Sequence, residues 1–163
     1  MSKIALITDT HYGARSDSIA YDRFFEKFYT DVFFPELEAR GIDTIVHLGD
    51  VFDRRKFINY ATLRSCKRYF FDQLESRGIT AHVLAGNHDT FFKNTNEVNS
   101  PDILLREYDN IITYSDPDVI NVGGRNILLM PWICADNYAK SMKMLKDNAT
   151  SVCFGHFEIA GFV

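Results

Sequence analysis

The amino-acid sequence predicts a single layered α/β domain, and three observations carry that prediction. Short apolar runs of strand length alternate along the chain with longer segments of helical periodicity. Polar residues gather directly after several of the apolar runs. The chain has 163 residues, of which 46% are hydrophobic, and this suits one domain with a sizeable core.

Seven apolar runs are predicted to be strands, and most of them are bounded by glycine or by polar turn residues. They are residues 3–8, 44–49, 80–85, 110–115, 118–123, 126–132 and 151–155. The Gly-Gly pair at 123–124 predicts a hairpin turn between the fifth and sixth runs.

Four segments are predicted to be helices: residues 20–39, 60–77, a short helix beginning at Ser100-Pro101, and 136–147. The first should bury one apolar face and bend near Pro35. That face consists of Tyr21, Phe24, Phe25, Phe28 and Val32. The second should bury a narrower stripe, made of Leu63, Cys66, Phe70 and Leu74.

Composition narrows the class of protein. The net charge of −4 and the pI near 5.7 argue against a domain that holds nucleic acid by bulk electrostatics, although bound divalent cations would offset the charge. No apolar run is long enough to span a membrane, and the first residues lack the pattern of a secretory signal. Three cysteines without CxxC spacing indicate reduced thiols, so we expect a cytoplasmic protein.

Four predicted strands end in polar groups of one chemical type. These groups are Asp9 and His11; Asp50, Asp53 and Arg54; Asn87, His88 and Asp89; and His156. Because the carboxyl ends of strands build the site in layered α/β domains, we expect these side chains to meet. Carboxylates, an amide and imidazoles together favour a pair of Mn²⁺, Fe or Zn cations, and a carboxylate such as Asp50 can bridge two ions.

Each motif also has a simpler interpretation, since a lone Asp after a strand is usually a turn or a helix cap. Four motifs in order, each at the end of a strand, argue against coincidence. Two other histidines, His47 and His82, lie within predicted strands and are interpreted as structural, and Trp132 is assigned to the core.

The ordered motifs D-x-H, G-D-x-x-D-R, G-N-H-D and G-H resemble those of the calcineurin-like metallophosphoesterases. The stretches "GDVFDRRKFIN", "GNHDTFFKN", "LLMPWICADN" and "FGHFEIAGF" resemble the SbcD-type DNA repair nucleases, particularly the recombination nuclease subunits of T-even-like bacteriophages. The resemblance spans essentially the whole chain. It implies a layered fold with central mixed sheets flanked by helices.

The resemblance implies a role for each site residue. Asp9 and His11 would bind the first metal, Asp50 would bridge, and Asn87 and His156 would bind the second metal. His88 would be the general acid or a phosphate contact, with Asp53 paired to it. Arg54 would contact phosphate or form a surface ion pair.

The implied activity is that of a Mn²⁺-dependent DNA exonuclease or endonuclease, with Mg, Fe or Zn as alternative metals. Its implied partners are DNA and an ABC-type ATPase of the SbcC class, acting in end processing, recombination and repair, in the host cytoplasm if the protein is phage-encoded. A homodimer through helix 60–77 is also implied, in which Tyr69 and Phe71 either contact a second copy or widen the buried face. Phe91, Phe92 and Lys93 would approach DNA, unless both phenylalanines are buried under their loop.

The family pattern continues to a G-H-x-H motif, whereas His156 is the last histidine here. We therefore expect residues 1–163 to be the amino-terminal part of a nuclease domain, without the capping and ATPase-docking regions and poorly active by itself. Two alternatives stay open: a phosphoesterase acting on phosphomonoesters or cyclic nucleotides, and a catalytically incomplete fragment that dimerises or docks a partner.

Overall fold

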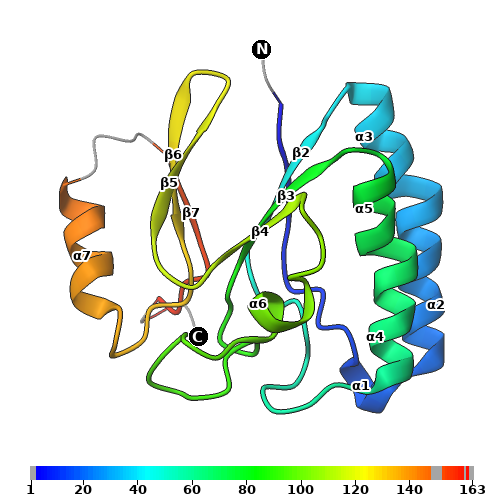
Figure 1. The fold of residues 1–163 in the computed structure, drawn as a ribbon, viewed down its shortest axis with the longest axis horizontal. Coiled ribbons are helices and arrows are strands. Elements are labelled where there is room, and N and C mark those ends of the chain that lie inside the picture. Colours follow the sequence, from blue (N-terminus) through cyan, green and yellow to red (C-terminus); the bar gives the residue numbers. More distant parts are fainter. Residues whose placement is uncertain (1–2, 148–151, 160, 162–163) are drawn as a thin grey trace.

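The computed structural model describes residues 3–147, 152–159 and 161, which form four layers (Figure 1). Two long helical segments cover one face of a four-stranded sheet, and a three-stranded sheet covers the other face. A further helix, α7 (Tyr138–Asp147), lies outside the second sheet. The predicted layered α/β fold, with helices flanking the sheets, is confirmed.

The four-stranded sheet is entirely parallel, in the order β1-β2-β3-β4. Its strands are β1 (Ala5–Ile7), β2 (Thr44–His47), β3 (Thr80–Leu84) and β4 (Ile111–Tyr114). All four predicted strands are present, each shorter than expected. The first three stop before the predicted run ends because the last residues turn into the loops at the lower edge of the sheet in Figure 1.

The second sheet is mixed. Strand β5 (Asp118–Val122) pairs antiparallel with β6 (Arg125–Met130), and β6 pairs parallel with β7 (Cys153–Gly155). The predicted hairpin is confirmed, because Gly123 and Gly124 both adopt positive φ between β5 and β6. Ser151, the first residue of the last predicted strand, lies outside the described residues.

Both long predicted helices contain a π-helical turn. The first runs through α2 (Ile19–Phe28), η1 (Tyr29–Phe33) and α3 (Phe34–Arg40), and the second through α4 (Tyr60–Cys66), η2 (Lys67–Phe71) and α5 (Asp72–Ser76). Pro35 falls in the first turn of α3, directly after η1, where a missing N–H is tolerated. The predicted irregularity therefore takes the form of a π-helical turn.

Two short helices lie among the loops, α1 (Ala14–Asp17) and α6 (Ser100–Leu104). The prediction placed the N-cap of α6 at Ser100, one residue too late. Asn99 is the cap, and its side chain accepts a hydrogen bond from the backbone N–H of Asp102 at 2.9 Å.

The predicted buried face of the first helix is wrong in most of its residues. Phe24 is 69% exposed and Val32 48% exposed, whereas Tyr29 and Phe34 are buried. Only Phe25 of the predicted set packs against the core. The helix is apolar around most of its circumference, so periodicity could not select one face, and the π-helical turn then shifts the phase.

The predicted stripe of the second helix is confirmed, with Cys66, Phe70 and Leu74 fully buried. Tyr69 and Phe71 are buried beside them, at 3% and 1% exposure. These two residues therefore widen the buried face, and they are not available to contact a second copy.

The four-stranded sheet has a core on each face. Aromatic residues dominate the core under the helices, where the ring centroids of Tyr29 and Phe70 are 4.5 Å apart. The core between the sheets is smaller and centres on Val46, Leu84 and Leu129. Trp132 is buried as predicted.

Two further predictions concern the state of the cysteines and the absence of a membrane-spanning segment. Cys66, Cys134 and Cys153 are free thiols, as the cysteine count suggested. No helix among the residues that the structure describes is long and apolar enough to cross a membrane.

Replacing Phe70 by Ala is expected to lower the free energy of unfolding by about 3–5 kcal/mol, because a buried aromatic side chain leaves a cavity. Phe24→Ala on the exposed face should change it by about 0.5 kcal/mol or less. Urea denaturation of the two variants measures both values. A larger loss in the Phe24 variant would show that the assigned helix face is wrong.

Candidate metal centre

The loops after β1 and β2 are joined by backbone hydrogen bonds that continue the parallel pairing of the strands. The N–H groups of His11 and Tyr12 donate to the carbonyls of Asp50 and Val51 at 3.0 and 2.9 Å, and the N–H of Asp53 donates back to Tyr12 at 3.1 Å. The first two sequence motifs are therefore held in one fixed register, each at the carboxyl end of its strand.

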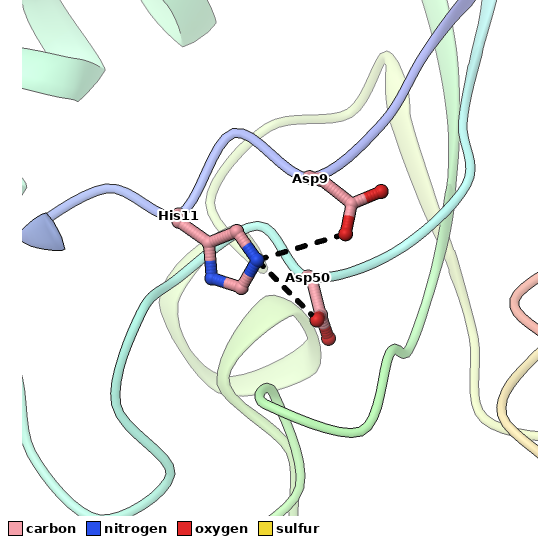
Figure 2. Close-up of side chains that lie close together, drawn as sticks. All are labelled: Asp9, His11 and Asp50. Atoms are coloured by element: carbon pink, nitrogen blue, oxygen red, sulfur yellow. Dashed lines mark ion pairs between the residues drawn. The ribbon is translucent and has the colours of Figure 1, made fainter. Parts of the chain in front are cut away.

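Three predicted ligands have strained backbones. Asp9, His11 and Asp50 have φ of 53°, 42° and 53°, and they make up half of the six non-glycine residues with positive φ in the described chain. Such conformations are costly for residues with a Cβ and tend to cluster at functional sites. Here they turn the three side chains toward one another (Figure 2).

These three side chains form the first ligand group. His11 Nε2 lies 3.6 Å from Asp9 Oδ1 and 3.5 Å from Asp50 Oδ2, and all the ligand atoms lie within 4.8 Å of one another. The two separations are too long for hydrogen bonds. Donor atoms bound to one cation at about 2.1 Å lie about 3.0–3.4 Å apart, so the group fits a metal ion with little adjustment.

A second ligand group lies on the other side of Asp50. His156 Nε2 is 2.8 Å from Asn87 Oδ1 and 3.5 Å from Asp50 Oδ1. The other ring nitrogen, Nδ1, lies 2.9 Å from the carbonyl of Leu48, which can only accept, so Nδ1 carries the proton of the neutral ring. Three lone-pair donors then converge without a hydrogen between them, and a cation is what this arrangement accommodates.

Two glycines make this approach of loops feasible. A Cβ on Gly86 would lie 2.2 Å from the backbone nitrogen of Asp50, and one on Gly49 would lie 2.9 Å from Gly86 Cα. Gly49 also has φ of 104°, which favours glycine. Residues without a Cβ at these two positions therefore allow the loops to lie this close together.

Asp89 joins the loop after β2 to the loop after β3 through hydrogen bonds, a role that sequence reasoning missed. Its buried carboxylate accepts from the backbone N–H groups of Gly86, Phe52 and Val51 at 2.9, 3.0 and 3.2 Å. Burial raises its pKa to about 6 despite these bonds. Asp89 was visible in the G-N-H-D motif, but nothing in the sequence showed that it would bind the loop after another strand.

His88 lies at the edge of the metal centre. Its backbone N–H donates to Asp50 Oδ1 at 2.8 Å, and its ring lies edge-on to that of His11, with centroids 4.9 Å apart. Its Nδ1 lies 2.9 Å from the backbone carbonyl of Asp53. The expected pairing through the acidic side chain of Asp53 is therefore replaced by a backbone contact, and the Asp53 carboxylate instead lies 3.6 Å from His11 Nδ1.

Arg54 forms the ion pair that was one of its two sequence interpretations. Its Nη1 donates to Asp17 Oδ2 at 2.7 Å, and Thr62 donates to the other Asp17 oxygen at 2.7 Å. Although burial acts in the opposite direction, these hydrogen bonds lower the pKa of Asp17. The guanidinium is therefore directed to the helix α1 region instead of the metal ligands.

The predicted DNA-contact residues are exposed, so the alternative that both phenylalanines are buried is wrong. Phe91 is 38% exposed and Phe92 is 46% exposed, and Lys93 beside them is exposed as well. Their rings form an edge contact with centroids 4.8 Å apart.

His47 is structural, as predicted, and its protonation state follows from its partners. Thr10 Oγ1 donates to the carbonyl of Val51, so it accepts from His47 Nε2–H at 3.1 Å. Nδ1 accepts the N–H of Gly49 at 3.2 Å. Burial lowers the pKa of His47 to about 3. The other predicted structural histidine, His82, lies 2.8 Å from the Tyr114 hydroxyl.

The four-layer fold, with two ligand groups sharing one carboxylate, defines a metal-dependent phosphoesterase. The chain belongs to the calcineurin-like phosphoesterase family, whose sequence profile matches residues 2–158.

Two curated relatives are nuclease or repair proteins. The chain is 33% identical over 163 residues to exonuclease subunit 1 of Enterobacteria phage T4, with 98% of this chain and 47% of that protein covered. It is 32% identical over 123 residues to the DNA double-strand break repair protein Mre11 of Sulfurisphaera tokodaii, with 72% and 29% covered. The chain thus spans less than half the length of these relatives.

A solved structure shares the fold. A protein of unknown function from Aquifex aeolicus superposes with a TM-score of 0.53 at 19% identity, over 99% of this chain and 83% of that one.

Replacing Asp50 by Ala is expected to abolish the uptake of two divalent cations, because each carboxylate oxygen faces a different ligand group. Calorimetric titration of Mn²⁺ measures this, with Asp116→Ala, which removes only an exposed ion pair with Lys140, as the control. Unchanged uptake by the Asp50 variant would refute the shared-ligand assignment.

Acidification is expected to destabilise the metal-free protein through His47. Its folded pKa lies below the unfolded value of about 6.5, so its stabilising contribution is complete above that value and is lost as the pH falls toward 3. Between pH 7 and 5 the loss should be about 2 kcal/mol. The raised pKa of Asp89 acts in the opposite direction over this pH range, so the contribution of His47 is the difference between the wild type and His47→Gln, whose amide can keep both hydrogen bonds. Urea denaturation of both proteins with EDTA at pH 7 and pH 5 measures this difference. An equal pH dependence of the two proteins would contradict the assignment.

Proposed function

We propose that this chain carries the phosphodiesterase centre of a DNA nuclease subunit that processes DNA ends in recombination and repair. The observation that carries the proposal is Asp50, whose Oδ2 faces His11 and whose Oδ1 faces His156. This arrangement suits a pair of cations, with Mn²⁺ the preferred metal because the ligands mix carboxylate, amide and imidazole. Such a pair supplies charge that polarises a phosphodiester and makes hydroxide available near neutral pH.

Among the residues that the structure describes, the proposed metal ligands number five: Asp9, His11, Asp50, Asn87 and His156. With so few protein ligands shared by two cations, water would complete the coordination, and we expect modest affinity. The low activity expected of the chain by itself follows from the same count.

His88 is the proposed general acid. The hydrogen bond from Nδ1 to the Asp53 carbonyl fixes the ring orientation, which leaves Nε2 as the atom that exchanges a proton. His88 follows Asn87 directly, and its ring lies beside the ligand groups. From there it could protonate the leaving oxygen of a phosphodiester. Asp53 acts on His88 through its carbonyl and on His11 through its carboxylate.

DNA is the proposed substrate because of what the two curated relatives are. One is an exonuclease subunit, similar to this chain over 98% of its length, and the other is a DNA double-strand break repair protein, similar over 72%. An ABC-type ATPase of the SbcC class is the proposed partner, and the cytoplasm the proposed location. A homodimer through helix 60–77 stays a prediction. It would have to use the outer side of that helix, where Tyr60 is 86% exposed, since Tyr69 and Phe71 are buried.

Replacing His88 by Asn should reduce hydrolysis of single-stranded DNA by about 10²–10⁴-fold, since a proton donor is removed. The reduction should be much smaller for bis-p-nitrophenyl phosphate, whose leaving group needs no proton. Steady-state rates with Mn²⁺ on both substrates measure the difference, with Asp50→Ala as the inactive control. Hydrolysis of the small ester without any activity on DNA would instead support a small-substrate phosphoesterase, and equal losses on both substrates would reject the general-acid role.

A further inference from the structure

A small apolar cavity lies next to the metal centre, between the loop after β2 and the chain from Asp89 to Leu104. Its volume is about 170 Å³, below the roughly 300 Å³ at which pockets for larger ligands begin, so it has room for a single ring. Phe57, Phe91 and Ile103 line its open side, at 66%, 38% and 54% exposure. Exposed aromatic and aliphatic side chains around one cavity form an apolar surface of the kind that usually marks a binding site.

Cations accompany the aromatic rings of the cavity. The Arg54 guanidinium lies 5.1 Å from the centroid of Phe57, and Lys56 Nζ lies 5.4 Å from that of Phe91. Together with Arg55, they form the only run of three consecutive basic residues in a chain of net charge −4. Aromatic rings combined with positive charge are the feature by which proteins hold single-stranded nucleic acid.

The neutral polar side chains in the cavity wall donate to partners within the protein. Asn99 accepts from Asp102 and donates to Asn96 and Ser115, while Ser100 Oγ donates to Asp89. The donors of these two side chains are thus in use, and the other donors in the wall belong to the basic side chains of residues 54–56. Recognition in this cavity would therefore depend on stacking and apolar contact, which every base offers.

Both walls of the cavity are connected along the chain to the proposed catalytic groups. On one side Arg54 follows Asp53, whose carbonyl holds His88; on the other, Phe91 comes three residues after His88. The N–H of Phe91 donates to the Val98 carbonyl at 2.9 Å, which fixes this loop. A strand with a phosphodiester at the metal centre would thus pass the cavity with a nearby nucleotide.

We propose that this cavity binds one unpaired base of a DNA strand, by stacking on Phe91 and Phe57, while a neighbouring phosphodiester lies at the metal centre. The inference rests on the proposed function for its DNA substrate. It adds a subsite that selects unpaired over paired nucleotides without reading sequence, since a base in a duplex is not free to enter the cavity.

Binding of short single-stranded oligonucleotides that each carry one abasic position tests the inference, because an abasic nucleotide keeps its phosphates and loses only its base. Fluorescence anisotropy with Ca²⁺, which avoids dependence on hydrolysis, measures the affinity. For the wild type we expect a loss of about 5- to 100-fold at one position and little change elsewhere. Exchanging the base at that position should alter the affinity by less than about threefold.

Phe91→Leu and Phe57→Leu should remove this position dependence, while Phe24→Leu, an exposed phenylalanine of α2 that does not line the cavity, should keep it. Circular dichroism and hydrolysis of bis-p-nitrophenyl phosphate confirm that each variant is folded. A uniform response to abasic positions, an equal effect of Phe24→Leu, or no oligonucleotide binding would overturn the inference. If the position dependence is found but Mn²⁺ supports no phosphodiester hydrolysis, the base subsite stands and the proposed nuclease function fails.

Discussion

The buried carboxylate of Asp89 is the interaction on which the geometry of the metal centre depends. It receives backbone N–H groups from the loop after β2 and from its own loop after β3, so it fixes the position of each relative to the other. Asp50 and His88 lie on these two loops and are joined by a further hydrogen bond. A carboxylate with several lone pairs can hold several donors at once, which a neutral side chain of the same size cannot.

The site assembled in this way is unfavourable for the protein alone. Asp9, Asp50 and Asp53 bring negative charge together around His11. Three of the candidate ligands, Asp9, His11 and Asp50, also adopt positive φ. Like charges at such distances and left-handed backbones both cost free energy. The fold holds these carboxylates in place, and bound cations would offset the repulsion between them.

Sequence reasoning identified the candidate ligands that the structure brings together, because they immediately follow strands and parallel strands place their carboxyl ends at one edge. It could not find interactions between loops whose relative position depends on tertiary packing. Three findings are of this kind: the role of Asp89, the use of the Asp53 backbone instead of its carboxylate, and the identity of Asp17 as the partner of Arg54. The exposed face of the first helix escaped prediction for a different reason, since phenylalanine occurs on nearly every side of that helix.

The distribution of charge reconciles the acidic composition of the chain with the anionic substrate proposed for it. The carboxylates of the metal centre are directed inward, toward the positions of the ligand groups, where cations would neutralise them. The basic run 54–56 follows Asp53 directly, and its cations lie over aromatic rings, so positive charge adjoins the centre along the same loop. Net charge therefore says little about this protein's substrate. One loop carries the carboxylate shared by the two ligand groups at its start and a cationic, aromatic surface a few residues later. A phosphodiester and its neighbouring base would therefore contact groups of complementary chemistry, one after the other.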